Sequence, residues 1–347
     1  MRVDSILGHD RPKTILSAAL AGGRLHHAWL FSGPAGVGKE LLAMIFARAL
    51  LCEGGDAGRP CEACESCERS ARGVNPDLVI VRPEAERVAR NEIDRDALEG
   101  SPSREIRIAE VRALERRLRL PSHRGGRTVA LISPAEAMNG SAQNALLKTL
   151  EEPPNGSVLL LVTDAEGALL PTVRSRCLRL PFGPLPTALL ERELRARLEC
   201  DEAVARSVAA LSGGSLGRAL QLGTESAERR YQVLDLLEVL TTSRGPDPIE
   251  IQRAAAEWSG DRDDTTWLLE ITEGYLRDLL AAAAGAGAEA LHNHDRVDPI
   301  LATAARVAPF RIHAALESLE EARAGLARNA NLRLTLERTL GRVAEAL

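Results

Sequence analysis

The segment that most constrains the fold is the glycine-rich turn "GPAGVGKE" at residues 33–40. A phosphate-binding loop has the pattern G-x-x-x-x-G-K followed by Ser or Thr, and residues 33–39 match it. An apolar run at residues 26–33 precedes the turn, and a helical pattern at residues 39–52 follows it. Backbone N–H groups of such a turn, and the N-terminus of the next helix, attract phosphate oxygens. The sequence therefore predicts a nucleotide-binding loop formed by Gly33, Pro34, Ala35, Gly36, Val37, Gly38 and Lys39.

The residue after this loop is Glu40, at the position where a magnesium-binding hydroxyl is expected. The second magnesium ligand of such sites is an acidic residue at the end of a neighbouring strand. The strand predicted at residues 127–133 ends in Ser133 and Pro134 instead, and Glu136 lies beyond its tip. Because two metal-binding positions are altered together, the sequence argues against ATP hydrolysis and leaves the binding of ATP or ADP open. The alternative is that Glu40 and Glu136 rebuild a metal site.

A second feature is a group of four cysteines between residues 52 and 67, with the spacing C-x8-C-x2-C-x2-C. Tight C-x2-C steps with four thiolates are typical of a closed tetrahedral zinc site, which leaves no position open for catalysis. The alternatives are redox chemistry or independent thiols. We predict a structural Zn²⁺ held by Cys52, Cys61, Cys64 and Cys67.

Buried strands and helical patterns alternate from residue 26 to residue 163, which is typical of a parallel α/β sheet with nucleotide chemistry at the carboxyl ends of its strands. Three prolines and a glycine in "LPFGPLP" (180–186) indicate a linker, and no strand is predicted from residue 187 onward. We expect an α/β domain, with a parallel sheet, flanking helices and a small zinc module, followed by an all-α lid and an all-α C-terminal domain. Their expected bounds are residues 1–181, with the zinc module at 52–67, then residues 182–225 and residues 226–347.

The composition is that of an ordinary globular protein, with 45% hydrophobic and 27% charged residues. The formal net charge of −5 predicts no basic field for binding DNA by charge alone. Residues 1–16 are charged throughout, unlike a signal peptide, and no apolar run approaches the about 18 residues of a spanning helix. We therefore expect a cytoplasmic protein without membrane contacts, in a compartment where stable disulfides are rare.

An arginine occurs between small residues in "PTVRSRCLRL" (171–180), and by itself such a charge is typically solvated or structural. Its surroundings, however, resemble a known family. The chain is similar to bacterial sliding-clamp loaders, the AAA+ proteins of the DNA polymerase III holoenzyme, over residues 1–222 and more weakly beyond. The matching segments, in the family's order, are the phosphate loop with its preceding strand, the cysteine cluster, "NALLKTLEEPP" (144–154), "SRC" (175–177) and "GGSLGRAL" (213–220).

In this family the arginine of "SRC" projects across a subunit interface into a neighbour's ATP site, which implies that Arg176 is an arginine finger acting in trans. The motor subunits, gamma and tau, carry Ser or Thr after the loop lysine and Asp-Glu at the end of the acidic strand. Glu40 and Ser133 depart from that pattern, so the chain resembles the delta-prime branch more closely. The resemblance places Thr163 and Arg218 at the two sensor positions.

The resemblance also implies a role and partners. It implies a stator subunit that does not itself hydrolyse ATP, whose residues 226–347 join an oligomerisation collar. The expected partners are the motor subunits (gamma/tau) and the delta subunit in a hetero-pentameric ring. Through that assembly the chain is expected to act on the sliding clamp and primer-template DNA.

Two rival functions differ from this one in class. The first is a catalytically active gamma/tau-type clamp-loader ATPase, in which Glu40 is an unusual metal ligand. The second is a zinc-dependent nucleic-acid-binding module, which requires a basic surface with interleaved aromatics near the cysteines. The segment "CEACESCERS" (61–70) has acidic residues and no aromatics, so the sequence disfavours the second rival.

Overall fold

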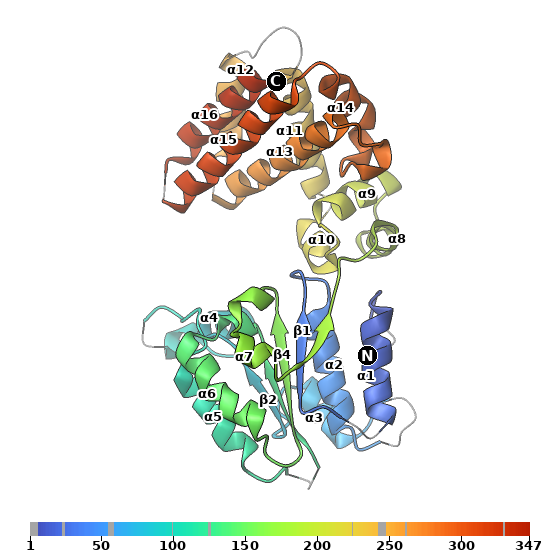
Figure 1. The fold of residues 1–347 in the computed structure, drawn as a ribbon, viewed down its shortest axis with the longest axis vertical. Coiled ribbons are helices and arrows are strands. Elements are labelled where there is room, and N and C mark those ends of the chain that lie inside the picture. The colour runs from blue at the N-terminus through green and yellow to red at the C-terminus, as the bar shows by residue number, and fades with distance from the viewer. Residues whose placement is uncertain are drawn as a thin grey trace. The chain divides into compact units, whose positions relative to one another are not determined.

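The computed structural model describes residues 6–22, 25–54, 59–98, 100–123, 126–223, 225–241, 248–260, 262–328 and 330–347. The chain divides into two compact units (Figure 1). The first unit comprises Met1–Pro186 with Gly214–Arg218, and the second comprises Thr187–Gly213 with Ala219–Leu347.

The first unit is built on a five-stranded sheet in the order β2-β3-β4-β1-β5, in which every neighbouring pair is parallel. The α/β class predicted from the alternating pattern is therefore confirmed. One strand, β5, was not predicted, because it is a short edge strand with mostly exposed side chains that lacks a continuous apolar run. The strands are β1 (Ala28–Ser32), β2 (Leu78–Val81), β3 (Thr128–Ile132), β4 (Ser157–Thr163) and β5 (Leu178–Pro181).

Helices cover both faces of this sheet (Figure 1). Trp29 and Phe31 of β1 pack on the α2 side, where Trp29 meets Phe46 edge-on at 5.4 Å between ring centroids. Leu30, between them, packs on the opposite side with α5 and α6, as the two-residue period of a strand requires. The helices are α1 (Asp10–Ala21), α2 (Lys39–Leu51), α3 (Glu65–Ala71), α4 (Glu84–Ala89), α5 (Ile108–Leu118), α6 (Gly140–Glu151) and α7 (Pro171–Arg174), with the 3-10 turns η2 (Arg95–Ala97), η3 (Ala135–Ala137) and η4 (Glu166–Ala168).

After Pro181, every regular element among the described residues is helical, as predicted. The second unit has its own core, in which Leu268 and Tyr275 of α13 pack with Ile312 of α15. The helices are α8 (Thr187–Leu198), α9 (Glu202–Leu211), α10 (Leu216–Leu222), α11 (Glu225–Leu240), α12 (Pro248–Trp258), α13 (Arg262–Ala283), α14 (Val297–Ala304), α15 (Pro309–Ala327) and α16 (Leu332–Ala346), with the 3-10 turns η5 (Ala288–Ala290) and η6 (His294–Arg296).

The expected lid, residues 182–225, is shared between the two units. Its helices α8 and α9 group with the C-terminal helices, whereas Gly214–Arg218 group with the sheet. The division into three functional domains stays a prediction. None of the described helices combines the length and the apolar character needed to cross a membrane.

Candidate functional site

The glycine-rich turn lies between β1 and α2, and its backbone depends on glycine. Gly36 has φ +70° and Gly38 has φ +104°, in the left-handed region that glycine favours. A Cβ on Gly33 would lie 2.2 Å from the carbonyl oxygen of Phe182, and one on Gly36 would lie 2.2 Å from Ser215 Oγ. The turn is therefore held against β5 on one side and against the Gly214–Arg218 segment on the other.

Lys39, the residue expected to reach a phosphate, is only 3% exposed. Its ammonium group donates to the carbonyl of Pro34 and forms an ion pair with Asp164, with 2.6 Å between Nζ and Oδ1. Asp164 directly follows β4. The positive charge of the loop is thus balanced by a carboxylate of the same unit.

The two altered magnesium positions contact one another. Ser133 Oγ donates to Glu40 Oε2 at 2.8 Å, although the residues are 93 positions apart in the chain. Arg82 Nη2 donates to Glu40 Oε1 at 2.6 Å, and Arg90 approaches both carboxylate oxygens at 3.0 Å. Burial alone would raise the pKa of Glu40, but the hydrogen bond and charge of Arg82, with the contributions of Ser133 and Arg90, lower it.

Among the described residues, Glu136 forms its hydrogen bond elsewhere and not with Glu40. Its Oε1 accepts the backbone N–H of Asp164 at 2.9 Å. The carboxylate of Glu40 is meanwhile taken up by two guanidinium groups and a hydroxyl. A magnesium ion needs oxygen ligands rather than cationic neighbours, so these residues do not fit a magnesium site.

The expected sensor positions lie at the loop. Thr163 ends β4, is buried, and its hydroxyl accepts the N–H of Ala165 at 3.1 Å. The N–H of Arg218 donates to Ser215 Oγ at 3.1 Å, and the neighbouring Gly217 N–H donates to the carbonyl of Gly36 at 3.0 Å. The fold therefore brings Thr163 and the backbone of Arg218 to the phosphate loop, while their sensor roles stay predictions.

Arg176 is held by α6 and α7. Its Nη1 donates to the carbonyl of Thr172 at 3.0 Å, and its Nη2 forms an ion pair with Glu151 Oε1 at 2.6 Å. The side chain is 35% exposed. The preceding segment is anchored by the buried Gln143, whose Oε1 accepts the N–H of Leu170 at 2.7 Å. Arg176 is thus a partly exposed cation that follows a segment hydrogen-bonded to α6.

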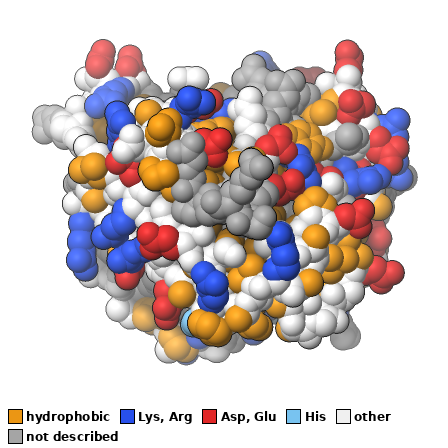
Figure 2. All heavy atoms as spheres, turned by 90° about the horizontal axis from the view of Figure 1, so that it is seen from above, with side chains coloured by type: hydrophobic (Ala, Val, Ile, Leu, Met, Phe, Trp, Pro, Cys, Tyr) orange, Lys and Arg blue, Asp and Glu red, His pale blue; other side chains and the backbone are white. Residues whose placement is uncertain are grey.

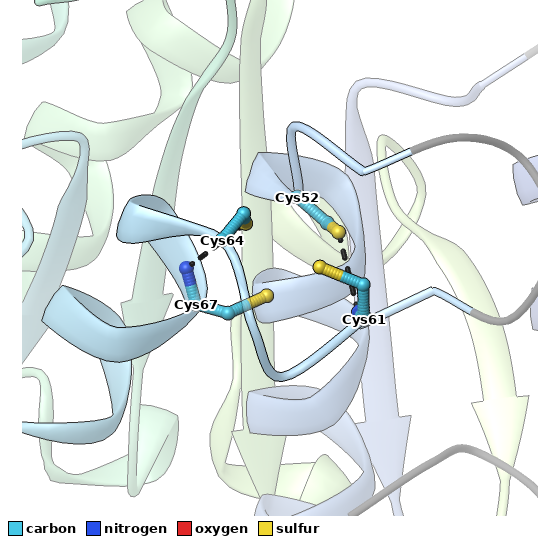
Figure 3. A group of neighbouring side chains, drawn as sticks. All are labelled: Cys52, Cys61, Cys64 and Cys67. Carbon is cyan, nitrogen blue, oxygen red and sulfur yellow. Dashed lines mark hydrogen bonds between the residues drawn. The ribbon is translucent and has the colours of Figure 1, made fainter.

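The four cysteines converge (Figure 3). All four Sγ atoms lie within 4.8 Å of one another, and no other group of potential metal ligands of this kind occurs among the described residues. The set joins the end of α2 to the start of α3. A Cβ on Gly54 would lie 2.8 Å from Cys61 Sγ, so only glycine leaves room at that position. These thiols fit a tetrahedral zinc ion.

Electrostatics within the cluster favour the thiolate form of one cysteine, Cys61. The N–H groups of Ala63 and Cys64 lower the pKa of Cys61 to about 6. Burial, by contrast, raises the pKa of Cys52 and Cys67. A bound Zn²⁺ would supply the charge that four neighbouring thiolates need.

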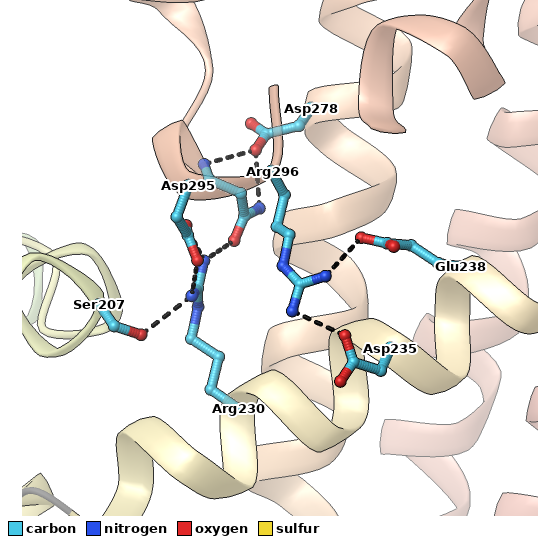
Figure 4. A network of polar contacts seen from close by, with 8 residues as sticks. Ser207, Arg230, Asp235, Glu238, Asp278, Asp295 and Arg296 are labelled. Carbon is cyan, nitrogen blue, oxygen red and sulfur yellow. Dashed lines mark hydrogen bonds and ion pairs between the residues drawn. The ribbon is translucent and has the colours of Figure 1, made fainter. Parts of the chain in front are cut away.

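Figure 4 shows a buried polar network in the second unit that no motif of the sequence predicts. Arg230 of α11 is 1% exposed and donates to Ser207 of α9 at 2.9 Å and to both oxygens of Asp295 at 2.7 and 2.8 Å. The buried Asp278 of α13 accepts two hydrogen bonds from Asn293, each at 2.7 Å. An arginine within a predicted helix carries no local signal of this role.

The surface seen in Figure 2 carries interspersed acidic and basic side chains among hydrophobic ones. Among the described residues of this face, no charge of one sign dominates, which agrees with the net charge of −5. Several large apolar side chains of the second unit are more than half exposed: Ile249, Phe310 and Leu334.

Comparisons with known proteins agree along the chain. Residues 8–186 match the family described as DNA polymerase III, delta subunit, and residues 225–345 match DNA polymerase III, delta subunit, C terminal. The DNA polymerase III subunit delta' of Pseudomonas aeruginosa is 40% identical over 219 residues, which span 62% of this chain and 62% of that relative. The delta' subunit of Bacillus subtilis is 30% identical over 277 residues, or 79% of this chain and 78% of the relative.

Among solved structures, a DNA polymerase III gamma subunit-related protein from Thermotoga maritima aligns over 97% of this chain and 99% of that chain. The sequence identity is 17% and the TM-score is 0.42.

Proposed function

The chain belongs to the delta' family of DNA polymerase III clamp-loader subunits, and on that premise we propose that it is a stator: a subunit that does not hydrolyse ATP and that supplies Arg176 to a neighbour's ATP site. The neighbour would be a gamma/tau-type motor subunit. The AAA+ α/β domain with its zinc module and the helical C-terminal region are the parts that such a subunit contributes.

The observation that carries the proposal is the contact between Ser133 and Glu40. In a hydrolysing subunit these two positions hold magnesium from the loop and from the neighbouring strand. Here they hydrogen-bond to one another at 2.8 Å, and Arg82 pairs with the same carboxylate. The result supports a loop that keeps its fold without the metal chemistry of ATP hydrolysis.

The geometry of Arg176 supports a role outside its own subunit. An arginine finger must present its guanidinium to the charge that develops on a transferred phosphoryl group. Arg176 is partly exposed, and its partners among the described residues are the surface carboxylate of Glu151, the carbonyl of Thr172 and the hydroxyl of Ser175. An exposed ion pair is worth about 0.2–1 kcal/mol, so a phosphate in a neighbouring subunit could displace Glu151.

The proposal includes the assembly. We expect the gamma/tau and delta subunits as partners in a hetero-pentameric ring that loads the sliding clamp on primer-template DNA in the cytoplasm. The exposed apolar side chains of the second unit, such as Phe310, offer contacts for a collar of helices. The cysteine cluster would hold structural zinc through Cys52, Cys61, Cys64 and Cys67.

The finger role is tested by replacing Arg176 with Ala in a reconstituted loader. Arg176→Ala should nearly abolish hydrolysis at the one motor site that this subunit serves, because an arginine finger contributes about 10³-fold or more to kcat at the site it enters. The ATPase rate per complex should therefore fall by the fraction that this site contributes. The matched control is Arg179→Ala, an exposed arginine of β5 that lies three residues further along the chain. Assembly, measured by sizing, should be unchanged. Equal ATPase rates for wild type and Arg176→Ala would refute the finger role.

A second candidate is an active ATPase motor, which the retained glycine conformations and Lys39 of the loop favour. ATP hydrolysis by the purified chain alone, with Lys39→Ala as control, separates the two. Turnover that disappears in Lys39→Ala would favour the motor.

A further inference from the structure

The charged segment between β2 and α5 has no part in the proposed finger chemistry, yet it is folded onto the phosphate-loop helix. It contains α4 and η2 and is closed at its base, where the N–H of Ala85 donates to the carbonyl of Ser103 at 3.0 Å. Ser103 N–H in turn donates to Glu84 Oε2 at 2.9 Å. The described part of this segment, residues 82–98 and 100–105, is therefore a structured excursion.

Two arginines of this excursion converge on Glu40. Arg82 directly follows β2 and its side chain is only 4% exposed. One of its terminal nitrogens contacts Glu40 at 2.6 Å and the other contacts Glu92 at 2.7 Å. Arg90 adds a two-pronged contact to Glu40, with both distances 3.0 Å. Such forked guanidinium–carboxylate pairs fix geometry as well as charge.

The cluster occupies the junction that a magnesium ion would bridge. Glu40 lies in the first turn of α2, Ser133 lies just beyond β3, and Arg82 lies just beyond β2. A magnesium ion would join the first two through oxygen ligands and would come and go with nucleotide. Here the hydroxyl of Ser133 and the guanidinium of Arg82 both contact the carboxylate of Glu40, and arginine does not lose its charge.

We propose that Arg82, supported by Arg90, takes the place of the divalent cation beside the phosphate loop. It joins α2 to the end of β2 through Glu40, while Ser133 at the end of β3 donates to the same carboxylate, all without metal. The excursion at residues 82–105 then exists to deliver these two arginines. The first turn of α2 keeps one geometry whether or not a magnesium–nucleotide complex is offered. This inference goes beyond the stator proposal, which uses the loss of the magnesium ligands but assigns no role to Arg90 or to the excursion.

The first test is local hydrogen exchange in the full chain. Arg82→Ala leaves the carboxylate of Glu40 without its buried partner, so amide exchange at Leu42 and in the rest of the first two turns of α2 should speed up by about tenfold or more. Arg90→Ala, which removes a more exposed partner, should give a smaller increase and covers the case in which Arg82→Ala fails to fold. The control is Arg95→Ala, an exposed arginine of the same excursion. Unchanged exchange in both Arg82→Ala and Arg90→Ala would overturn the proposal.

The second test asks whether magnesium has a place at the loop. The melting temperature of the full chain is measured with ADP in Mg²⁺ and with ADP in EDTA. We expect the two shifts to be equal after subtraction of the nucleotide-free samples, whether they are zero or positive. Stabilisation that requires Mg²⁺ and disappears in EDTA would overturn the proposal. Neither test involves Arg176 or a second subunit, so failure of the finger role would leave both results unaffected.

Discussion

The buried network of the second unit offers the sharpest stability prediction, with Arg230→Met as the perturbation. Methionine keeps the long aliphatic part of the side chain and removes the guanidinium. Asp295 then loses the group that contacts both of its oxygens at 2.7 and 2.8 Å. Burial would raise the pKa of Asp295, but the hydrogen bond and charge of Arg230, with contributions from a backbone N–H and from Arg296, lower it.

The magnitude follows from this geometry. Arg230 is 1% exposed and also donates to Ser207, and removing one partner of such a buried pair costs about 3–5 kcal/mol. For a unit of this size each kcal/mol lowers the melting temperature by about 2–4 °C, so the second unit should melt roughly 6–20 °C lower.

Tryptophan fluorescence can follow the second unit alone. The chain has three tryptophans, and Trp258 and Trp267 stack at 6.0 Å within the second unit. In a Trp29→Phe background, thermal unfolding monitored by fluorescence reports that unit. Arg306→Met, at an exposed position, is the matched control. Melting of Arg230→Met within about 2 °C of that control would contradict the prediction. It would mean that removing Arg230 costs less than about 1 kcal/mol of unfolding free energy, as for an exposed ion pair.

Two further predictions concern the first unit. Gly54→Ala should lower zinc affinity by about tenfold or more, because the new Cβ would displace Cys61. The measurement is the zinc content of the protein during dialysis against increasing concentrations of chelator, with Gly140→Ala, where a Cβ meets open space, as the control. Equal zinc retention in the two variants would contradict the prediction. The lowered pKa of Glu40 contributes stability above its unfolded value of 4.5 that is lost as the pH falls through the still lower folded value. The stability of the first unit, followed by urea unfolding, should therefore fall more steeply with acid below pH 4.5 in wild type than in Glu40→Gln, and parallel curves would argue against the ion pairs.

Much of the architecture could be read from local patterns. The phosphate-loop turn, the four cysteines and the continuous apolar strands β1, β3 and β4 each leave a signal within a short window of sequence. The reason is physical: backbone conformation at glycines, metal-ligand spacing and burial on both sheet faces all act on neighbouring residues. The edge strand β5 was missed because an exposed edge needs no apolar run.

The cation at the phosphate loop could not be predicted in the same way. The sequence shows that Glu40 and Ser133 depart from a magnesium site, but not what Glu40 binds instead. Its partners Arg82 and Arg90 are 42 and 50 residues away, and they are two among many arginines. No periodicity selects them, because an ion pair depends only on where the chain brings two charges.

The sequence by itself therefore determined the α/β class and predicted the cluster of four cysteines and the departure of Glu40 and Ser133 from a magnesium site, since each of these depends on adjacent or regularly spaced residues. Only the tertiary structure decided that Lys39 pairs with Asp164, that Arg82 and Arg90 close on Glu40, and that Arg230 ties α9 to α11. These contacts join residues far apart in the chain, and the groups that make them meet only after the chain has folded.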